Sequence, residues 1–176
     1  MARTVLLTLP WAILFIQKLS SIDTTKTTTA TQEIKKRDAD GCHHVFIDGG
    51  ANIGVHGRFL LEPEKYPDAT FAHKTFNTQF GTDVNNRDNR DFCVYEIEPN
   101  PAHYETLMKK SRAYSNMGWR YHVMNVGLSD QDEILPFYRR NDTQNEEWGF
   151  STIKFFEYAE KVEVPIIRFS KGLFWW

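Results

Sequence analysis

Residues 45–54 read Val-Phe-Ile-Asp-Gly-Gly-Ala-Asn-Ile-Gly, and the fold is predicted outward from them. The apolar run 43–48 stops at a glycine pair, which predicts a buried strand. Residues 52–61 then predict a helix. A buried strand that turns through glycines into a helix is typical of an α/β fold with a parallel sheet.

The pattern repeats on the carboxyl side of this stretch. Residues 92–97 predict a second strand, and Asn100-Pro101 predicts a helix start, with Asn as the cap and Pro in the first turn. Residues 116–118 end that helix, and 120–128 predict a third strand. Residues 134–139 and 162–167 predict further strands, whereas the polar residues 62–91 are expected to form an insertion.

Ligands of open parallel sheets bind beyond the carboxyl ends of the strands. The loops after Asp48, Glu98 and Val126 are therefore expected to meet at one edge. The first loop carries an acid where a dinucleotide site has an apolar residue, and Ala51 stands in place of the second glycine of that fingerprint. A carboxylate here favours S-adenosylmethionine, whose sulfonium and ammonium groups are cationic.

Two later positions extend the candidate site. Glu98 can accept hydrogen bonds from both hydroxyls of a ribose, or it can interact with the dipole of the helix that follows. Gly127 leaves room for a flat adenine beyond the third strand, while Asp130 nearby equally suits the start of a turn.

Residues 45–54, 98–101 and 125–130 occur in the order seen in FkbM-type methyltransferases, and residues 43–169 resemble that family. The resemblance implies a Rossmann-like parallel sheet of the class I methyltransferase type. It also implies that the chain binds S-adenosylmethionine and methylates a hydroxyl on a sugar or small metabolite. The cofactor-binding residues that it implies are Asp48, Gly49, Gly50, Ala51, Asn52, Gly54, Glu98, Asn100 and Gly127. It names no catalytic residue.

The chain departs from the family pattern at its carboxyl end. The family continues with a further strand beside the first one, and no such segment is present, so residues 41–170 are expected to be an incomplete, C-terminally truncated domain with residues 171–176 as a tail. The first strand would then keep an open edge, unless 134–139 and 162–167 pair across the gap. We therefore expect no turnover. A non-catalytic nucleotide-binding or interaction module is the alternative, and a dinucleotide-dependent oxidoreductase is less well supported.

The amino terminus predicts a targeting segment. Arg3 precedes the apolar run 5–16, which is too short to span a bilayer and matches a signal-peptide core, so residues 1–21 are expected to be a signal peptide or a signal anchor. The Thr-rich residues 22–40 are expected to be a disordered spacer. These features predict a lumenal or secreted protein, or alternatively a membrane-anchored one.

The remaining polar residues give weaker indications. Cys42 and Cys93 are either buried thiols or, in an oxidising compartment, a disulfide between the amino-terminal ends of two neighbouring strands. His43 and His44 open a strand on opposite faces, which disfavours a metal site. His56 could approach the cofactor or simply pack. Scattered basic residues and a net charge of −2 argue against nucleic acid as a partner.

Overall fold

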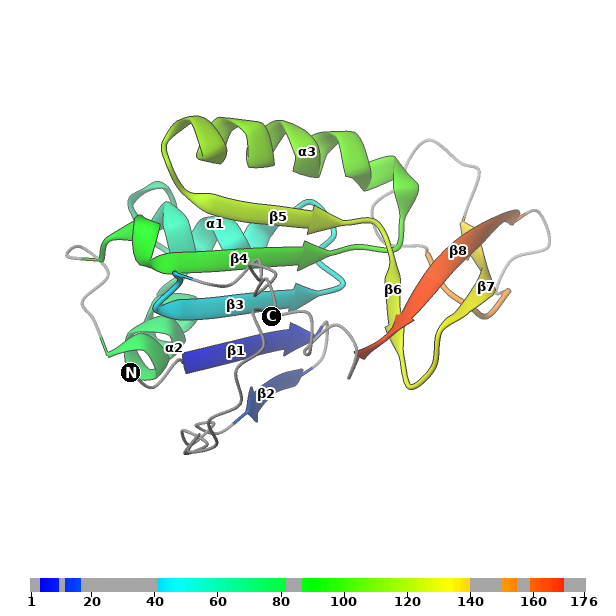
Figure 1. The fold of residues 1–176 in the computed structure, drawn as a ribbon, viewed down its shortest axis with the longest axis horizontal. Coiled ribbons are helices and arrows are strands. Elements are labelled where there is room, and N and C mark those ends of the chain that lie inside the picture. Colours follow the sequence, from blue (N-terminus) through cyan, green and yellow to red (C-terminus); the bar gives the residue numbers. More distant parts are fainter. Residues whose placement is uncertain are drawn as a thin grey trace, which may run out of the picture.

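A computed structural model of the chain describes residues 4–9, 12–16, 41–81, 87–139, 150–154 and 159–169, the first two ranges by their backbone only. These residues form a mixed α/β fold with a five-stranded sheet and a smaller three-stranded sheet (Figure 1). The predicted spacer at 22–40 and the tail at 171–176 lie outside the described residues.

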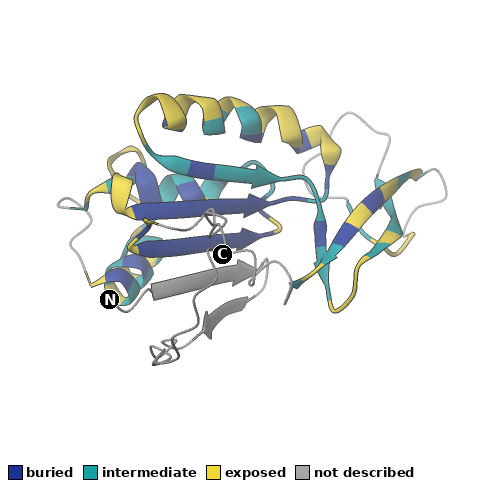
Figure 2. Ribbon diagram, viewed as in Figure 1, coloured by how far each residue is buried: buried dark blue, intermediate teal, exposed yellow. Residues whose placement is uncertain are grey.

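The main sheet has the strand order β2-β1-β3-β4-β5, and all neighbours are parallel except β2 and β1. Every residue of the two central strands β3 and β4 is buried, as expected for parallel strands covered on both faces (Figure 2). The predicted first and second strands are thus confirmed. The strands are β1 (Thr4–Leu9), β2 (Ala12–Ile16), β3 (His44–Gly49), β4 (Phe92–Ile97) and β5 (Arg120–Met124).

The expectation of an open edge on the first strand is wrong. β1 lies parallel to β3 along its length, with Thr4 opposite His44 and Thr8 opposite Asp48. Strands β1 and β2 both come from the segment expected to be a signal peptide or anchor, and that processing remains a prediction. Within the part of the chain that the structure describes, no helix is both long enough and apolar enough to cross a membrane.

Three helices cover one face of the main sheet. Their side chains pack with those of Phe46, Val94 and Tyr121 from three successive strands in one apolar cluster. The opposite face carries a second cluster, which includes Val45 and Tyr95. The helices are α1 (Val55–Leu61), α2 (Thr70–Phe80) and α3 (Pro101–Asn116), and two short 3-10 turns, η1 (Pro63–Lys65) and η3 (Asn89–Asp91), flank α2.

The helices refine three expectations. Helix α3 starts as predicted, because the Asn100 side chain accepts a hydrogen bond of 3.1 Å from the Ala102 N–H. Helix α1 begins later than predicted, since Asn52 and Gly54 have left-handed φ angles of 52° and 71°. The insertion at 62–91 is not only polar, because it contains α2, which buries Phe76 and Phe80 in the core.

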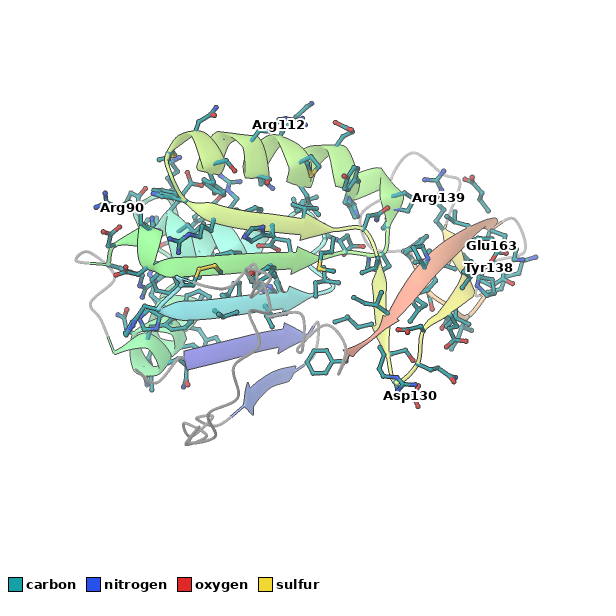
Figure 3. The ribbon with its side chains drawn as sticks, viewed as in Figure 1. Arg90, Arg112, Asp130, Tyr138, Arg139 and Glu163 are labelled. Carbon is teal, nitrogen blue, oxygen red and sulfur yellow. A yellow bond between two sulfur atoms is a disulfide. The ribbon has the colours of Figure 1, made fainter. Side chains whose placement is uncertain are left out.

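The predicted third strand is divided between the two sheets. Residues 120–124 form β5, whereas β6 (Gly127–Ser129) joins β8 (Glu160–Arg168) and β7 (Glu133–Arg139) in the order β6-β8-β7. The strands predicted at 134–139 and 162–167 are therefore present, but they pair with each other and do not extend the main sheet. This second sheet lies beyond the carboxyl ends of β3, β4 and β5, and charged residues such as Arg139 and Glu163 lie along its outer side (Figures 1 and 3).

A disulfide joins Cys42 and Cys93 near the amino-terminal ends of β3 and β4, with 5.7 Å between the two Cα atoms (Figure 3). Of the two interpretations left open by the sequence, the structure therefore has the bridge. Both sulfur atoms belong to residues that are almost completely buried. The bridge fixes the sheet at the end opposite to the candidate site.

Candidate functional site

The carboxyl ends of β3 and β4 bring the two predicted acidic loops to one edge of the main sheet. The register places Asp48 beside Glu96 and Gly49 beside Ile97, and Glu98 follows directly. Asp48 and Glu98 therefore lie at the same end of the sheet, as predicted. The glycine loop is tied to the neighbouring strand, because the N–H groups of Gly50 and Ala51 both donate to the Ile97 carbonyl.

Glu98 holds the loops together. Its carboxylate accepts a hydrogen bond of 2.7 Å from the Asn52 N–H and another of 2.8 Å from the Asn100 N–H. Its own backbone is held from the third strand, since the Asn125 side-chain amide donates to the Glu98 carbonyl. Burial raises the pKa of Glu98, and the two N–H donors oppose that rise.

Two roles were predicted for Glu98, binding of a ribose and interaction with the dipole of α3, and its hydrogen bonds are compatible with both. The bond to Asn100 places the carboxylate at the start of α3, as the dipole interpretation requires. Each carboxylate oxygen has two lone pairs, so both oxygens keep the capacity to accept a further hydrogen bond. The arrangement is therefore compatible with a hydroxyl-bearing ligand as well.

Asp48 does not face solvent. Its side chain is 1 % exposed and lies beneath the imidazole of His56, whose Nδ1 is 3.1 Å from one carboxylate oxygen and 3.2 Å from the other. We expected this carboxylate to attract a cationic ligand directly, but its near neighbour is a histidine on α1. The hydrogen bond to Asp48, opposed by burial, raises the pKa of His56.

Glu96 is the site residue that the sequence analysis missed. It is fully buried on the helix-covered face and occupies the position opposite Asp48. Burial, reinforced by the Asp48 charge, raises the pKa of Glu96 well above its usual value. The available signal was its place in the second strand, two residues after Val94, where the alternation of faces puts an acid among core residues.

Two glycines at the start of α1 make room for this buried acid: Gly54, which precedes the helix, and Gly57 within it. A Cβ at Gly57 would lie 2.1 Å from Oε1 of Glu96, and a Cβ at Gly54 would lie 2.5 Å from the Tyr121 hydroxyl oxygen. Gly54 also has the positive φ that side chains disfavour. Both residues therefore let the start of α1 approach β4 and β5 closely. Burial raises the pKa of Tyr121, and the Glu96 charge adds to the effect.

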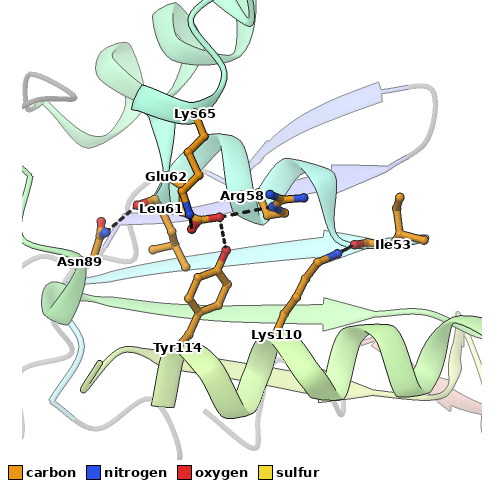
Figure 4. A network of polar contacts seen from close by, with 8 residues as sticks. All are labelled: Ile53, Arg58, Leu61, Glu62, Lys65, Asn89, Lys110 and Tyr114. Atoms are coloured by element: carbon orange, nitrogen blue, oxygen red, sulfur yellow. Dashed lines mark hydrogen bonds and ion pairs between the residues drawn. The ribbon is translucent and has the colours of Figure 1, made fainter. Parts of the chain in front are cut away.

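The other end of α1 is held by a network of polar contacts (Figure 4). Glu62 accepts hydrogen bonds from Arg58, Lys65 and Tyr114, the last at 2.8 Å from α3. Burial alone would raise the pKa of Glu62, but these donors outweigh it and the pKa is lowered. On the same side, Lys110 of α3 donates to the carbonyl of Ile53 in the glycine loop. Helix α3 thus supports both ends of the segment that follows the loop.

Gly127 lies against a side chain of the second sheet, and the adenine space predicted beside it stays a prediction. A Cβ at this position would lie 2.5 Å from Cδ1 of Ile166, because β6 packs beside β8. The missing side chain therefore serves the packing of the second sheet. Gly127 belongs to the second sheet, whereas Asp48 and Glu98 lie at the carboxyl edge of the main sheet.

The first two histidines lie at the opposite end of the sheet. His44 is buried against the rings of Phe80 and Phe92, while His43 is exposed. The two imidazole rings are in edge contact, with 4.5 Å between their centroids. Burial lowers the pKa of His44 to about 4. Among the described residues, no group of three or more His, Cys, Asp and Glu side chains is arranged to hold a metal ion.

No family model matches the chain, and no curated protein or solved structure matches it. What the structure itself establishes is an α/β protein with a largely parallel sheet and two acidic loops at the carboxyl edge of that sheet.

Proposed function

We propose that the chain binds S-adenosylmethionine at the carboxyl edge of the main sheet and transfers its methyl group to a hydroxyl of a sugar or small metabolite. The observation that carries the proposal is Glu98, which joins the glycine loop to the start of α3 while it keeps lone pairs for the hydroxyls of a ribose. The resemblance to FkbM-type methyltransferases also implies that Glu98 is a cofactor-binding residue.

The charge of the edge supports a cationic ligand over a dinucleotide. Asp48 and Glu98 lie at the carboxyl ends of β3 and β4. An acidic environment attracts the sulfonium and ammonium groups of S-adenosylmethionine and repels a pyrophosphate. Asp48 contributes to this field from beneath His56, without a direct contact to solvent.

The pairing of β1 with β3 removes one ground for expecting an inactive chain, the unpaired edge of the first strand. The other ground, the family's further strand with its acceptor-positioning groups, is not addressed by this pairing. Turnover is part of the proposal, and the methyl-transfer assay decides it. We also retain the secretory pathway as the proposed location, in the form in which residues 1–21 stay on the chain, since β1 and β2 come from them. The Cys42–Cys93 disulfide supports an oxidising compartment.

The test is a direct binding measurement on the full chain by isothermal titration calorimetry, with S-adenosylmethionine and NAD⁺ as separate ligands. We expect the first to bind and the second not to. Glu98→Gln should weaken binding by roughly 1–3 kcal/mol, because a carboxylate acceptor becomes an amide. Glu160→Gln is the matched control, since Glu160 pairs with Arg139 in the second sheet.

Each of the other outcomes contradicts the proposal in a different way. Binding of NAD⁺ alone would favour an oxidoreductase, and binding of neither ligand would favour the interaction module. If S-adenosylmethionine bound equally well to wild type and Glu98→Gln, Glu98 would have only the structural role at the start of α3. Thermal unfolding of both variants checks that the loops keep their fold.

A further inference from the structure

The contact between His56 and Asp48 is a feature that donor binding alone does not require. His56 lies in the first turn of α1, directly after the glycine loop, and its side chain is 48 % exposed. Its Nδ1 faces the buried carboxylate of Asp48 at 3.1 Å. The imidazole is thus anchored on its inner side and open to solvent on its outer side.

This arrangement fixes the tautomer of the imidazole. The carboxylate of Asp48 accepts a hydrogen bond from Nδ1–H, so in the neutral ring the lone pair is on Nε2. The described residues offer no hydrogen-bond partner to Nε2. An imidazole that is oriented by a buried carboxylate and keeps Nε2 free has the geometry of a general base.

A second buried carboxyl group supports Asp48 from below. Glu96 on β4 is the register partner of Asp48, and burial together with the Asp48 charge raises the pKa of its carboxyl well above the usual value. A carboxyl group with a raised pKa holds its proton to higher pH, and in that form it can donate a hydrogen bond. Glu96 therefore supports the Asp48 side chain from the neighbouring strand.

Few polar or aromatic groups surround His56 and Asp48 among the described residues. Asp48 from β3 is the charged side chain that faces the imidazole, and Phe59 of α1 is its ring neighbour, with 6.3 Å between the ring centroids. Behind Asp48, Glu96 is approached by the Tyr121 hydroxyl from β5 and by the Lys110 charge from α3. The hydrogen bond to Asp48 raises the pKa of His56, which favours an imidazole that can hold a proton.

We propose that His56 is the general base of the methyl transfer, and that Asp48 and Glu96 are the positioning residues that orient it. The inference rests on the proposed function. It also assigns the acceptor to the outer side of His56, so the substrate is a hydroxyl compound that approaches over the start of α1.

The proposed step is balanced. The acceptor oxygen attacks the methyl carbon of S-adenosylmethionine, the carbon–sulfur bond breaks, and its electron pair stays on sulfur, which gives S-adenosylhomocysteine. The hydroxyl proton moves to Nε2 of His56 and then to solvent. The imidazolium formed in this step is stabilised by the Asp48 carboxylate.

The first test measures the titration of His56 by NMR, which needs neither donor nor acceptor. The Cε1–H resonance of His56 should titrate above the ordinary value of 6.5. In Asp48→Asn the titration should move to lower pH, because the charged partner is lost. A wild-type His56 that titrates at or below 6.5 would overturn the pairing.

The second test measures turnover with S-adenosylmethionine and a panel of monosaccharides and hydroxylated aromatic compounds. His56→Gln should lower kcat by about 10²–10⁴-fold and leave donor affinity unchanged. The rate of the wild type should rise with pH as His56 loses its proton, and Asp48→Asn should move this limb to lower pH. His43→Gln, an exposed histidine at the other end of β3, is the matched control.

The results of these tests distinguish a failure of the proposed role of His56 from a failure of S-adenosylmethionine binding. If His56→Gln keeps its turnover with an unchanged pH profile, the proposal is wrong. If the wild type binds S-adenosylmethionine but methylates none of the panel, the base is refuted while donor binding stands. If the wild type fails to bind the donor, the proposed function fails, and the catalytic role of His56 fails with it.

Discussion

Replacing Gly57 with alanine tests the buried acid most directly. In the interior of a helix, glycine costs about 0.5–1 kcal/mol relative to alanine, so Gly57→Ala would ordinarily stabilise the protein. Here the new Cβ would lie 2.1 Å from Oε1 of Glu96 and 3.0 Å from a ring carbon of Tyr121. The first distance is more than 1 Å shorter than the roughly 3.3 Å at which carbon and oxygen ordinarily approach.

The cost of that overlap exceeds the gain in helix propensity. Forcing an extra methyl group into a packed interior costs about 1–3 kcal/mol. Glu96 is completely buried, so its carboxyl cannot move into solvent to avoid the methyl group. We expect Gly57→Ala to lower the free energy of unfolding by about 1–2 kcal/mol, which corresponds to a fall in Tm of roughly 2–8 °C.

Urea denaturation of four proteins forms the assay: the wild type, Gly57→Ala, Glu96→Ala and the double variant. In the Glu96→Ala background the nearer obstacle is gone, and the Tyr121 ring at 3.0 Å has room to shift into the space that Glu96 leaves. Gly57→Ala should therefore stabilise this background by about 0.5–1 kcal/mol. The coupling energy between the two positions should then be about 2 kcal/mol, within the range for residues in contact. Ser115→Ala, on the exposed side of α3, reports the ordinary gain from alanine in a helix.

If Gly57→Ala instead stabilised the wild type as much as it stabilises Glu96→Ala, the Glu96 carboxyl would not lie against α1. The proposal that Glu96 supports Asp48 beneath His56 would then be wrong as well. Unchanged m-values across the four proteins would show that the comparison concerns the native state.

Three further predictions concern stability. The pKa of Glu96 is raised in the folded protein, so its contribution to stability is present below about pH 4.5 and is lost as pH rises toward the raised value. Glu96→Gln should therefore stabilise the protein at pH 7. Urea denaturation across this pH range should show a smaller loss of stability in the variant than in the wild type. His44 has a lowered pKa of about 4, so its effect has the opposite sign: the free energy of unfolding falls as pH drops from 6.5 to 4. The loss is up to about 3 kcal/mol, at 1.4 kcal/mol for each pKa unit. His44→Phe should remove this loss. Reduction of the Cys42–Cys93 bridge, which spans 51 positions, should cost about 4 kcal/mol by the loss of loop-closure constraint, and equal denaturation midpoints with and without reductant would contradict the prediction.

Local patterns predicted the centre of the fold well. The apolar runs that form β3 and β4 need burial on both faces, and this requirement is visible in the sequence itself. The same holds for the start of α3, where Asn100 and Pro101 act on their immediate neighbours. The placement of Asp48 and Glu98 at one edge followed from those strands alone.

Features that depend on distant partners could not be predicted in the same way. The run at 5–16 has the composition of a leader, and its pairing with β3 depends on a strand about forty positions further along the chain. The division of 120–128 depends on β8, which draws Gly127 into another sheet. Glu96 was missed because the alternation along its strand shows that it shares a face with Val94 but does not show what covers that face.

The hydrogen bonds that Glu98 makes to Asn52 and Asn100 have a consequence for binding thermodynamics. The Asn52 backbone is held in a left-handed conformation with φ of 52° by the same carboxylate that a ligand would approach. The loop is thus already in place before any ligand arrives, so association does not include the entropic cost of ordering its backbone, about 1–2 kcal/mol for each residue fixed. That conformational entropy is lost during folding and not at each binding event, which favours rapid and reversible exchange of ligands at this edge.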